Sequence, residues 1–374
     1  MKILLVGAGG YGARYVIELL NSKRDDIVFE GIVDPFLQSS REYANICAAK
    51  IPAYNTMEEF YAEHSADLAI ICTPIFLHCE QSITALKHGS YVLCEKPVAP
   101  TLEEAELMLE AERKYGRFIA IGYQWSFSDA ILDLKRDILD GVLGKPISMK
   151  NIVCWPRDLS YYGRGGGWAG KIEREGRLVL DSIASNACAH YLHNMLFLLG
   201  ATMDECARAT EVYADCLRAN DIETFDTCTI RAYASGTPIF LAASHATDKG
   251  RDPEFVFEFE RATVSYFDND EVGIRAVFAS GEEKCYGKPV KPNNFEKLWN
   301  TVDDVIEGKV PLCTVKTAMA HTALINDIHK TAVYRQFDKE SVVLNTEKNA
   351  LYVPGLYERI SRAYDEARLL SELE

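Results

Sequence analysis

The amino-acid sequence predicts an α/β Rossmann domain followed by an α+β domain with an open, mostly antiparallel sheet. The chain has 374 residues, which at roughly 150 residues per domain indicates two domains. Short apolar strands, each leading into a helical pattern, fill residues 1–122, as in a parallel sheet covered on both faces. Strands joined by turns then replace this alternation. We therefore predict domains at 1–122 and 123–374, with C-terminal helices able to pack back on the first domain.

Alternating strands and helices make up the predicted first domain. Its strands are Lys2–Val6, Val28–Asp34, Asp67–Thr73, Tyr91–Glu95 and Phe118–Gly122. Its helices include Ala13–Leu20, His78–His88, and two that begin after Thr56 and Thr101. Each of these threonines is followed three residues later by a glutamate, which is the pattern of a capping box.

The second domain has a different pattern. Its predicted helices are Asp129–Leu139, Asn186–Leu199, Phe295–Glu307, Ala318–Val333 and Gly355–Leu370. A strand at Ile147–Trp155 leads into an irregular stretch, Pro156–Gly176, and further strands fill Glu211–Tyr286. Phe255, Phe257 and Phe259 alternate with other residues, which indicates a half-exposed antiparallel strand.

Composition excludes several classes of function. With 55 acidic and 40 basic residues, the formal net charge is −15, whereas bulk nucleic-acid binding needs a basic face. No apolar run approaches the roughly 18 residues of a membrane span, and glycines follow the N-terminal strand too early for a signal peptide. The 11 cysteines are scattered without a C-x-x-C pair, so we expect reduced thiols in a cytoplasmic protein rather than disulfides or zinc.

A glycine-rich segment predicts a dinucleotide site. Gly7-Ala8-Gly9-Gly10-Tyr11-Gly12 is a G-x-G-x-x-G sequence between the first strand and the first helix, where backbone can approach a pyrophosphate and the helix N-terminus offers N–H groups. Asp34 ends the second strand 22 residues after Gly12, and its carboxylate can accept hydrogen bonds from a ribose diol. That charge would repel a 2′-phosphate, so NAD is favoured over NADP. Arg41 is the counter-argument, although it also fits an ordinary surface arginine.

Two further strand ends carry candidate site residues. Thr73-Pro74-Ile75-Phe76-Leu77-His78 and Glu95-Lys96-Pro97 each follow an apolar strand, and ligands bind beyond the carboxyl ends of parallel strands. Beside an oxidised nicotinamide, the pKa of Lys96 would fall, so that Lys96 could exchange a proton with a substrate hydroxyl. The alternative is a lysine that simply extends from a loop.

With these residues in place, the sequence resembles the Gfo/Idh/MocA oxidoreductases, a family typified by glucose–fructose oxidoreductase and inositol dehydrogenase. The resemblance rests on residues 7–12, Asp34, residues 73–78 and above all Glu95-Lys96-Pro97. It implies NAD(P) binding by the first domain, Lys96 near the reacting carbon, and a second domain that holds the substrate and often an oligomer interface. The expected cofactor contacts are Gly7, Gly9, Gly10, Tyr11, Gly12, Asp34, Thr73, Pro74, Phe76, His78, Glu95, Lys96 and Gln124.

The family usually shows D-x-G-x-H-x-x-D on the helix after the substrate loop. Counting back from Leu198-Leu199-Gly200 places His190 at the family's histidine, with Asn186 and His193 in place of the two aspartates. Asn186 and His190, four residues apart, are expected to share one helix face. Asn186 can donate and accept hydrogen bonds but cannot take up a proton. The His190–His193 pair lacks a third metal ligand in the sequence, so we expect no metal. The histidines at 64, 88, 245, 321 and 329 are expected at ordinary surface or core positions.

The irregular stretch is the other candidate for substrate binding. It is rich in aromatic residues, which stack on sugar rings, and in arginines, which bind carboxylates through two parallel hydrogen bonds. An exposed loop packed by its own aromatic residues is the alternative. The expected substrate contacts are Lys96, Tyr123, Arg157, Tyr162, Arg164, Trp168, Asp181, Asn186 and His190.

Three functions compete. The leading hypothesis is an NAD-dependent dehydrogenase of a sugar, cyclitol or sugar acid in which Lys96 and His190 manage the proton. The second is an enzyme that recycles bound NAD without net redox, as in family members that cleave glycosides or epimerise sugars; Asn186 is the reason to keep it. The third is a nucleotide-sensing module without catalysis, against which the intact Lys96 argues. We expect a homo-oligomer, a dimer or tetramer, that binds neither nucleic acid nor membrane.

Overall fold

A computed structural model describes residues 1–269, 271–290 and 295–373. The chain forms two compact units. The first unit comprises residues 1–124 and 293–319, and the second unit comprises residues 125–292 and 320–374. No helix of the described residues is long and apolar enough to cross a membrane.

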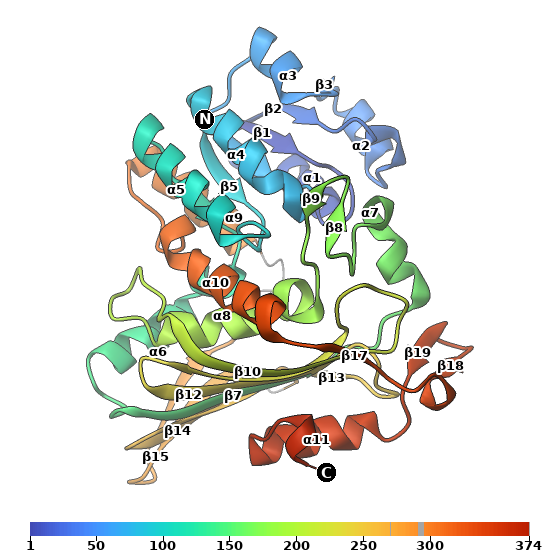
Figure 1. Cartoon of the computed structure of the whole chain (residues 1–374). Helices are drawn as coiled ribbons and strands as arrows, with labels where there is room; N and C mark the ends of the chain where they lie inside the picture. Colours follow the sequence, from blue (N-terminus) through green and yellow to red (C-terminus); the bar gives the residue numbers. More distant parts are fainter. Residues whose placement is uncertain (270, 291–294, 374) are drawn as a thin grey trace. The chain divides into compact units, whose positions relative to one another are not determined.

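The first unit is a parallel sheet with helices packed against it (Figure 1). Its strands are β1 (Lys2–Val6), β2 (Val28–Val33), β3 (Ala53–Tyr54), β4 (Leu68–Ile71), β5 (Tyr91–Cys94) and β6 (Ile119–Ile121). Their order is β3-β2-β1-β4-β5-β6, with every pairing parallel. The order reverses between β1 and β4, and ligands of such sheets bind beyond the strand ends at that point. The predicted Rossmann domain is confirmed.

The helices of the first unit come mainly from its N-terminal part. They are α1 (Gly12–Leu20), α2 (Tyr43–Ala48), α3 (Met57–Glu63), α4 (His78–Lys87), α5 (Leu102–Tyr115) and α9 (Glu296–Glu307). Thr56 and Glu59 form the predicted reciprocal capping box of α3, and Thr101 accepts from the backbone N–H of Glu104 at the start of α5. The helix α9 comes from far along the chain and contacts β5.

The second unit contains a nine-stranded sheet. Its strands are β7 (Pro146–Cys154), β10 (Ala209–Arg218), β11 (Thr227–Ala234), β12 (Thr237–Ser244), β13 (Arg251–Phe259), β14 (Ala262–Phe267), β15 (Ile274–Phe278), β16 (Glu283–Gly287) and β17 (Tyr334–Gln336). Their order is β16-β15-β14-β13-β7-β12-β11-β10-β17. The pairs β7–β12 and β10–β17 are parallel and the others antiparallel, so the sheet is mixed and mostly antiparallel, as predicted.

Helices cover both faces of this sheet. One core contains residues of α6 (Asp129–Leu139), α8 (Ala189–Leu198) and the C-terminal part of α10 (Val315–Thr331). A smaller core on the other face is built around α11 (Leu356–Glu366), which packs on β12 and β7 (Figure 1). Phe255 and Phe257 of β13 are fully buried, with ring centroids 4.1 Å apart, in agreement with the predicted alternation.

Two predicted segments of the second unit differ in the structure. Pro156–Gly176 is not wholly irregular, because it contains 3₁₀ turns at Leu159–Gly163, the short helix α7 (Arg164–Gly167) and one strand of the hairpin β8 (Glu173–Arg174)–β9 (Arg177–Leu178). A second hairpin joins β18 (Val343–Asn345) to β19 (Ala350–Tyr352).

The predicted single helix Asn186–Leu199 is also wrong at its start. Ser182 caps a π-helical turn over Ile183–Ala187, in which the N–H of Cys188 donates to the carbonyl of Ile183 at 2.8 Å, and α8 begins only at Ala189. This wider turn changes the angle between successive side chains. Spacing by four residues therefore does not place Asn186 and His190 on one α-helical face.

Candidate cofactor site and substrate loop

The glycine-rich turn brings three backbone segments of the first unit together. Gly7 has a φ of +88°, and a Cβ on it would lie 2.6 Å from the carbonyl oxygen of Cys72. A Cβ on Gly12, at the start of α1, would lie 2.1 Å from the carbonyl oxygen of Gly7. Larger residues cannot occupy either position without backbone movement. Gly9 and Gly10 are exposed, with open space where a Cβ would stand, so the outer surface of the turn is bare backbone that a pyrophosphate can approach.

Asp34 is held against this turn. Its Oδ2 accepts from the N–H of Ala8 at 2.8 Å, and its Oδ1 accepts from the N–H of Phe36 at 2.8 Å. The hydroxyl of Ser40 donates to the carbonyl of Ala8 at 2.7 Å. The carboxylate is therefore fixed at the end of β2 next to the glycine-rich turn, the position from which it can accept hydrogen bonds from a ribose. Arg41 is exposed, and its guanidinium lies 3.8 Å from the carboxylate of Glu42.

His78 joins the two loops that follow β4 and β5. Its side chain is buried, with Nε2 3.0 Å from the carbonyl oxygen of Thr73 and Nδ1 2.8 Å from that of Pro97. Burial lowers the pKa of His78. Thr73 also donates through its hydroxyl to Gln81, while Pro74 and Phe76 are half-buried beside it. The contacts of His78 show that it fixes the two loops; a direct contact with the cofactor remains a prediction.

Glu95 takes part in a buried ion pair that the sequence did not indicate. Its carboxylate accepts from the ammonium of Lys297 on α9 and, at 2.6 Å, from the hydroxyl of Tyr15 on α1. Burial raises the pKa of Glu95, but the charge and hydrogen bond of Lys297 outweigh that effect and hold it below its usual value. Lys297 also lies against the ring of Tyr11, 4.7 Å from its centroid. Lys297 thus connects Glu95, at the end of β5, to Tyr11 of the glycine-rich turn.

Lys297 could not have been found from spacing, because it is 202 residues from Glu95 along the chain. The one available signal is its place in α9, where Leu298 and Val302 form an apolar face. A lysine next to such a face is ordinarily taken to extend into solvent.

Lys96 directly follows Glu95 and is half-buried. Its backbone N–H donates to its neighbour's carboxylate at 3.3 Å, and its peptide bond to Pro97 is cis. At the end of β6, Gly122 donates to the carbonyl of Cys94 at 2.7 Å, Tyr123 is fully buried, and Gln124 is half-buried. These strand ends therefore meet at one edge of the sheet of the first unit.

In the second unit, Asp181 connects the segment Pro156–Gly176 to the π-helical turn. Its Oδ2 accepts from the N–H of Gly170 at 2.7 Å, and its Oδ1 accepts from the side-chain amide of Asn186 at 2.9 Å. Asp181 is 3% exposed, so these contacts give it a positioning role. His190 is half-buried in the first turn of α8.

Aromatic rings and arginines alternate along the loop itself. The Arg157 guanidinium carbon lies 5.3 Å from the ring centroid of Trp155 and 4.8 Å from that of Tyr161. The Arg164 guanidinium carbon lies 3.6 Å from the centroid of Tyr161 and 5.2 Å from that of Trp168. Each arginine thus lies against two rings. The hydroxyl of Tyr162 lies 2.9 Å from Nδ1 of His245, a buried histidine that was expected only at an ordinary position.

His193 of the second unit is buried and takes part in a hydrogen bond. Its Nε2 lies 3.0 Å from the hydroxyl of Ser126, and burial lowers its pKa well below the usual value. Within the described residues, no three histidine, cysteine or carboxylate side chains gather as metal ligands would. None of the 11 cysteines, all of which lie in the described residues, is joined in a disulfide bond, and seven of them are buried.

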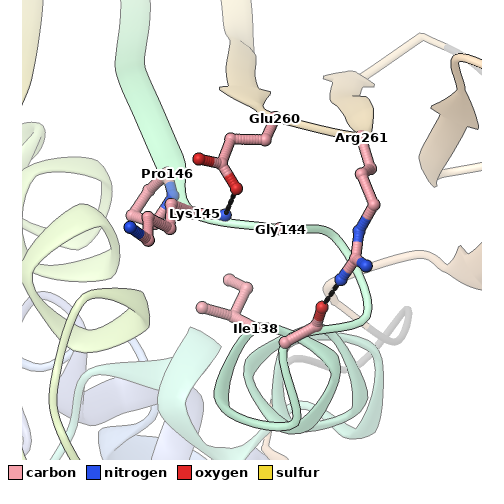
Figure 2. A pocket seen from close by; sticks show the side chains of 7 residues that line it. Ile138, Gly144, Lys145, Pro146, Glu260 and Arg261 are labelled. Carbon is pink, nitrogen blue, oxygen red and sulfur yellow. Dashed lines mark hydrogen bonds between the residues drawn. The ribbon is translucent and has the colours of Figure 1, made fainter.

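A shallow hollow lies elsewhere on the second unit, between the C-terminal end of α6 and β7 (Figure 2). Glu260 accepts from the N–H of Lys145 at 3.0 Å, and Arg261 donates to the carbonyl of Gly141. None of its lining residues is a predicted site residue, and we assign it no function.

The parallel sheet, the glycine-rich turn and the fixed carboxylate of Asp34 define a protein with a dinucleotide-binding Rossmann unit. Residues 1–123 match the model of the oxidoreductase family with an NAD-binding Rossmann fold. The match covers about a third of the chain, and it supports the resemblance to the Gfo/Idh/MocA oxidoreductases and NAD as the cofactor of this unit.

Curated relatives agree with this assignment over the same part of the chain. Glucose-6-phosphate 3-dehydrogenase of Bacillus subtilis is 28% identical over 149 residues, which are 40% of this chain and 41% of that protein. Inositol 2-dehydrogenase of Salmonella typhimurium is 26% identical over 148 residues, 39% of this chain and 44% of that protein. The chain thus matches about two fifths of the length of these relatives.

Solved structures share the fold over most of the chain. An oxidoreductase from Agrobacterium radiobacter, in complex with NAD+, L-tartaric acid and magnesium, has a TM-score of 0.72 and 16% identity, covering 88% of this chain and 96% of that one. The WlbA dehydrogenase from Bordetella pertussis, in complex with NADH and UDP-GlcNAcA, has a TM-score of 0.70 and 20% identity, with the same coverage. These likenesses confirm the predicted fold class.

Proposed function

We propose that this protein is an NAD-dependent oxidoreductase that acts on a CH–OH group of a sugar, cyclitol or sugar acid, either oxidising it to a carbonyl with NAD or forming it from the carbonyl with NADH. The observation that carries the proposal is the turn of Gly7 and Gly12 with the Asp34 carboxylate fixed against it. Bound there, NAD supplies the acceptor for a hydride. Two of the relatives are named as dehydrogenases of glucose 6-phosphate and of inositol. These names support a polyol substrate.

Lys96 and His190 are the residues that we propose to handle the proton. As hydride leaves the carbon of a CH–OH group, its hydroxyl must lose a proton, and a neutral lysine or histidine can accept one. We also propose Asn186 as a substrate contact. Its side-chain amide donates to Asp181, and an amide group is able to hydrogen-bond to a sugar hydroxyl.

The domain roles follow from this proposal. Residues 1–122 would hold the cofactor and residues 123–374 the substrate. We further propose that the protein is cytoplasmic, because 11 cysteines scattered without a disulfide pattern suit a reducing compartment. We also propose a homo-oligomer, a dimer or tetramer, because the antiparallel sheet with alternating apolar residues offers a face for association. Light scattering of the purified chain tests the oligomer, and a single-chain mass would refute it.

A substrate panel tests the activity. Purified protein with NAD and individual polyols should produce reduced nicotinamide, followed by its absorbance, in stoichiometric amounts. Product formed without consumption of NAD would instead indicate the glycosidase or epimerase alternative. Tight NAD binding with no turnover of any polyol would indicate the nucleotide-sensing alternative.

A further inference from the structure

The loop of the second unit carries two cationic groups next to one aromatic ring. The guanidinium groups of Arg157 and Arg164 both lie against Tyr161. Among the described residues, neither arginine forms an ion pair with a carboxylate; the side-chain hydrogen bond of Arg164 goes to the carbonyl of Tyr161 at 2.5 Å. Like charges this close repel each other, and a bound anion would remove that repulsion.

Two buried nitrogen atoms at the arginines have no hydrogen-bond partner among the described residues. Nε of Arg157 is buried without a hydrogen-bond partner in the described part of the chain, and so is Nε2 of the adjacent His245. Burial, and then the charges of Arg157 and Arg164, lower the pKa of His245 well below its usual value. A buried polar group without a partner costs free energy, so the unpartnered Nε–H donor of Arg157, beside a second cation, indicates a missing acceptor.

Two nearby acids accept hydrogen bonds within the chain, and the hydrogen bond of Ser160, helped by the charge of Arg157, lowers the pKa of Asp158. Asp158 accepts from the N–H groups of Ser160 and Tyr161 at 2.8 and 3.1 Å, and Asp181 accepts from Gly170 and Asn186. Both serve to hold the loop in shape.

Backbone contacts anchor the loop at both ends. At its start, the N–H groups of Trp155 and Arg157 donate to the carbonyls of Ser244 and His245 at 2.9 and 3.2 Å. At its end, Gly170 is held by Asp181. The two rings next to each guanidinium further restrict the arginines, so little conformational entropy would be lost when they bind.

We propose that Arg157 and Arg164 form a subsite for an anionic group, a carboxylate or a phosphate, on the substrate. Guanidinium groups bind both through paired N–H···O hydrogen bonds, and the flanking Trp155 and Trp168 are able to stack on the attached sugar. The substrate class is therefore a sugar acid or a sugar phosphate rather than a neutral polyol. The sugar part of this inference rests on the proposed function, whereas the anion part does not.

Direct binding tests the anion subsite without turnover. Calorimetric titration in the absence of NAD, with gluconate, glucose 6-phosphate and neutral glucose as probes, should give heat with at least one anionic probe and weaker or no binding of glucose. A comparison of the affinities for gluconate and glucose 6-phosphate shows whether the subsite prefers a carboxylate or a phosphate. Equal binding of all three, or binding of glucose alone, would overturn the proposal.

Matched variants locate the subsite. Arg157→Met and Arg164→Met should each weaken binding of the preferred anion at least tenfold, since a hydrogen bond from a guanidinium to an anion is charge-assisted and therefore strong. Arg157→Lys should restore part of it, because the charge remains but the paired geometry is lost. Arg208→Met removes an exposed arginine of the same unit and should change nothing. An equal loss in Arg208→Met, or none in the loop variants, would contradict the assignment, and circular dichroism checks that each variant is folded.

Turnover separates this inference from the proposed function. If NAD is reduced, kcat/KM for the anionic substrate relative to a neutral polyol should fall at least tenfold in the loop variants and stay constant in Arg208→Met. If no substrate reduces NAD but anions still bind in an Arg157-dependent manner, the dehydrogenase proposal fails and the anion subsite stands. If a neutral polyol is the best substrate and the ratio does not change, the subsite fails and the dehydrogenase stands.

Discussion

Lys297 in the first unit and Arg157 in the second are both cations packed against aromatic rings, but only Lys297 has a carboxylate partner among the described residues. Lys297 pairs with the buried Glu95 and lies 4.7 Å from the centroid of the Tyr11 ring. Arg157 lies against Trp155 and Tyr161, and its Nε has no partner in the described part of the chain. An ion pair within the chain, such as that of Lys297 and Glu95, stabilises the fold. A cation without such an ion pair, such as Arg157, is available to bind a ligand.

Substitution of Lys96 should lower catalysis, whereas substitution of Lys297 should lower stability. Lys96→Met should lower kcat about 10²–10⁴-fold, the range for loss of a positioned acid or base, while the melting temperature stays close to that of the wild type. Steady-state kinetics and thermal unfolding measure the two effects. Full turnover by Lys96→Met would remove this residue from the proposed proton transfer.

Lys297→Met should have the largest effect on stability. It leaves the Glu95 carboxylate buried without its cation, which costs about 3–5 kcal/mol. Urea unfolding followed by fluorescence measures the loss. The control is Lys135→Met, which removes an equally buried lysine of the second unit that donates to the carbonyl oxygens of Met203 and Glu205.

The carbonyl oxygens of Met203 and Glu205 that accept from Lys135 carry no charge, so losing these two hydrogen bonds in Lys135→Met should cost less than losing the Glu95 ion pair in Lys297→Met. The double variant Glu95→Gln/Lys297→Met should recover part of the stability because the buried charge is gone. Equal losses in the two lysine variants, with no recovery in the double variant, would show that the ion pair is not the source of the effect.

Glu112 provides a comparison with Glu95, because its carboxylate forms no ion pair like that of Glu95 with Lys297 among the described residues. Its Oε1 accepts from the N–H of Ile119 at 2.6 Å, and burial raises its pKa to about 7. Because this pKa lies above that of an unfolded glutamate, near 4.5, its contribution to stability is complete below pH 4.5 and is lost as the pH rises through 7.

Glu112→Gln should therefore stabilise the protein by up to about 3 kcal/mol at pH 8 and above, with no gain below pH 4.5. Urea unfolding at several pH values measures the difference. A gain that does not depend on pH would contradict the assignment of a buried, raised pKa to this group.

Asp34→Asn should have the smallest effect. The amide keeps one acceptor oxygen but loses the charge that strengthens a hydrogen bond to the ribose, so Kd for NAD should rise about tenfold, or about 1.4 kcal/mol. Titration with NAD and NADP measures it. A larger loss for NADP than for NAD would contradict the role given to Asp34, since its charge should repel the 2′-phosphate.

Local patterns predicted most of the first unit and part of the second. The alternation of apolar strands and helices determined the parallel sheet, and the Gly7–Gly12 spacing with Asp34 located the cofactor turn, because each depends on neighbours in sequence. The turn after Ser182 could not be predicted in this way. Ser182 caps a π-helical turn together with Ser185, and helical periodicity does not encode that backbone geometry. The partners Glu95 and Lys297, and Tyr162 and His245, come from distant segments, and no single-sequence pattern brings them together.

The most direct test of the central claim is reduction of NAD by a CH–OH substrate. Purified protein should be mixed with NAD and, in turn, gluconate, glucose 6-phosphate, glucose and inositol, while nicotinamide absorbance and the products are followed together. We predict stoichiometric reduced nicotinamide and ketone with at least one of them, and its near-complete loss in Lys96→Met. Product that accumulates while NAD stays oxidised would contradict the assignment as a dehydrogenase.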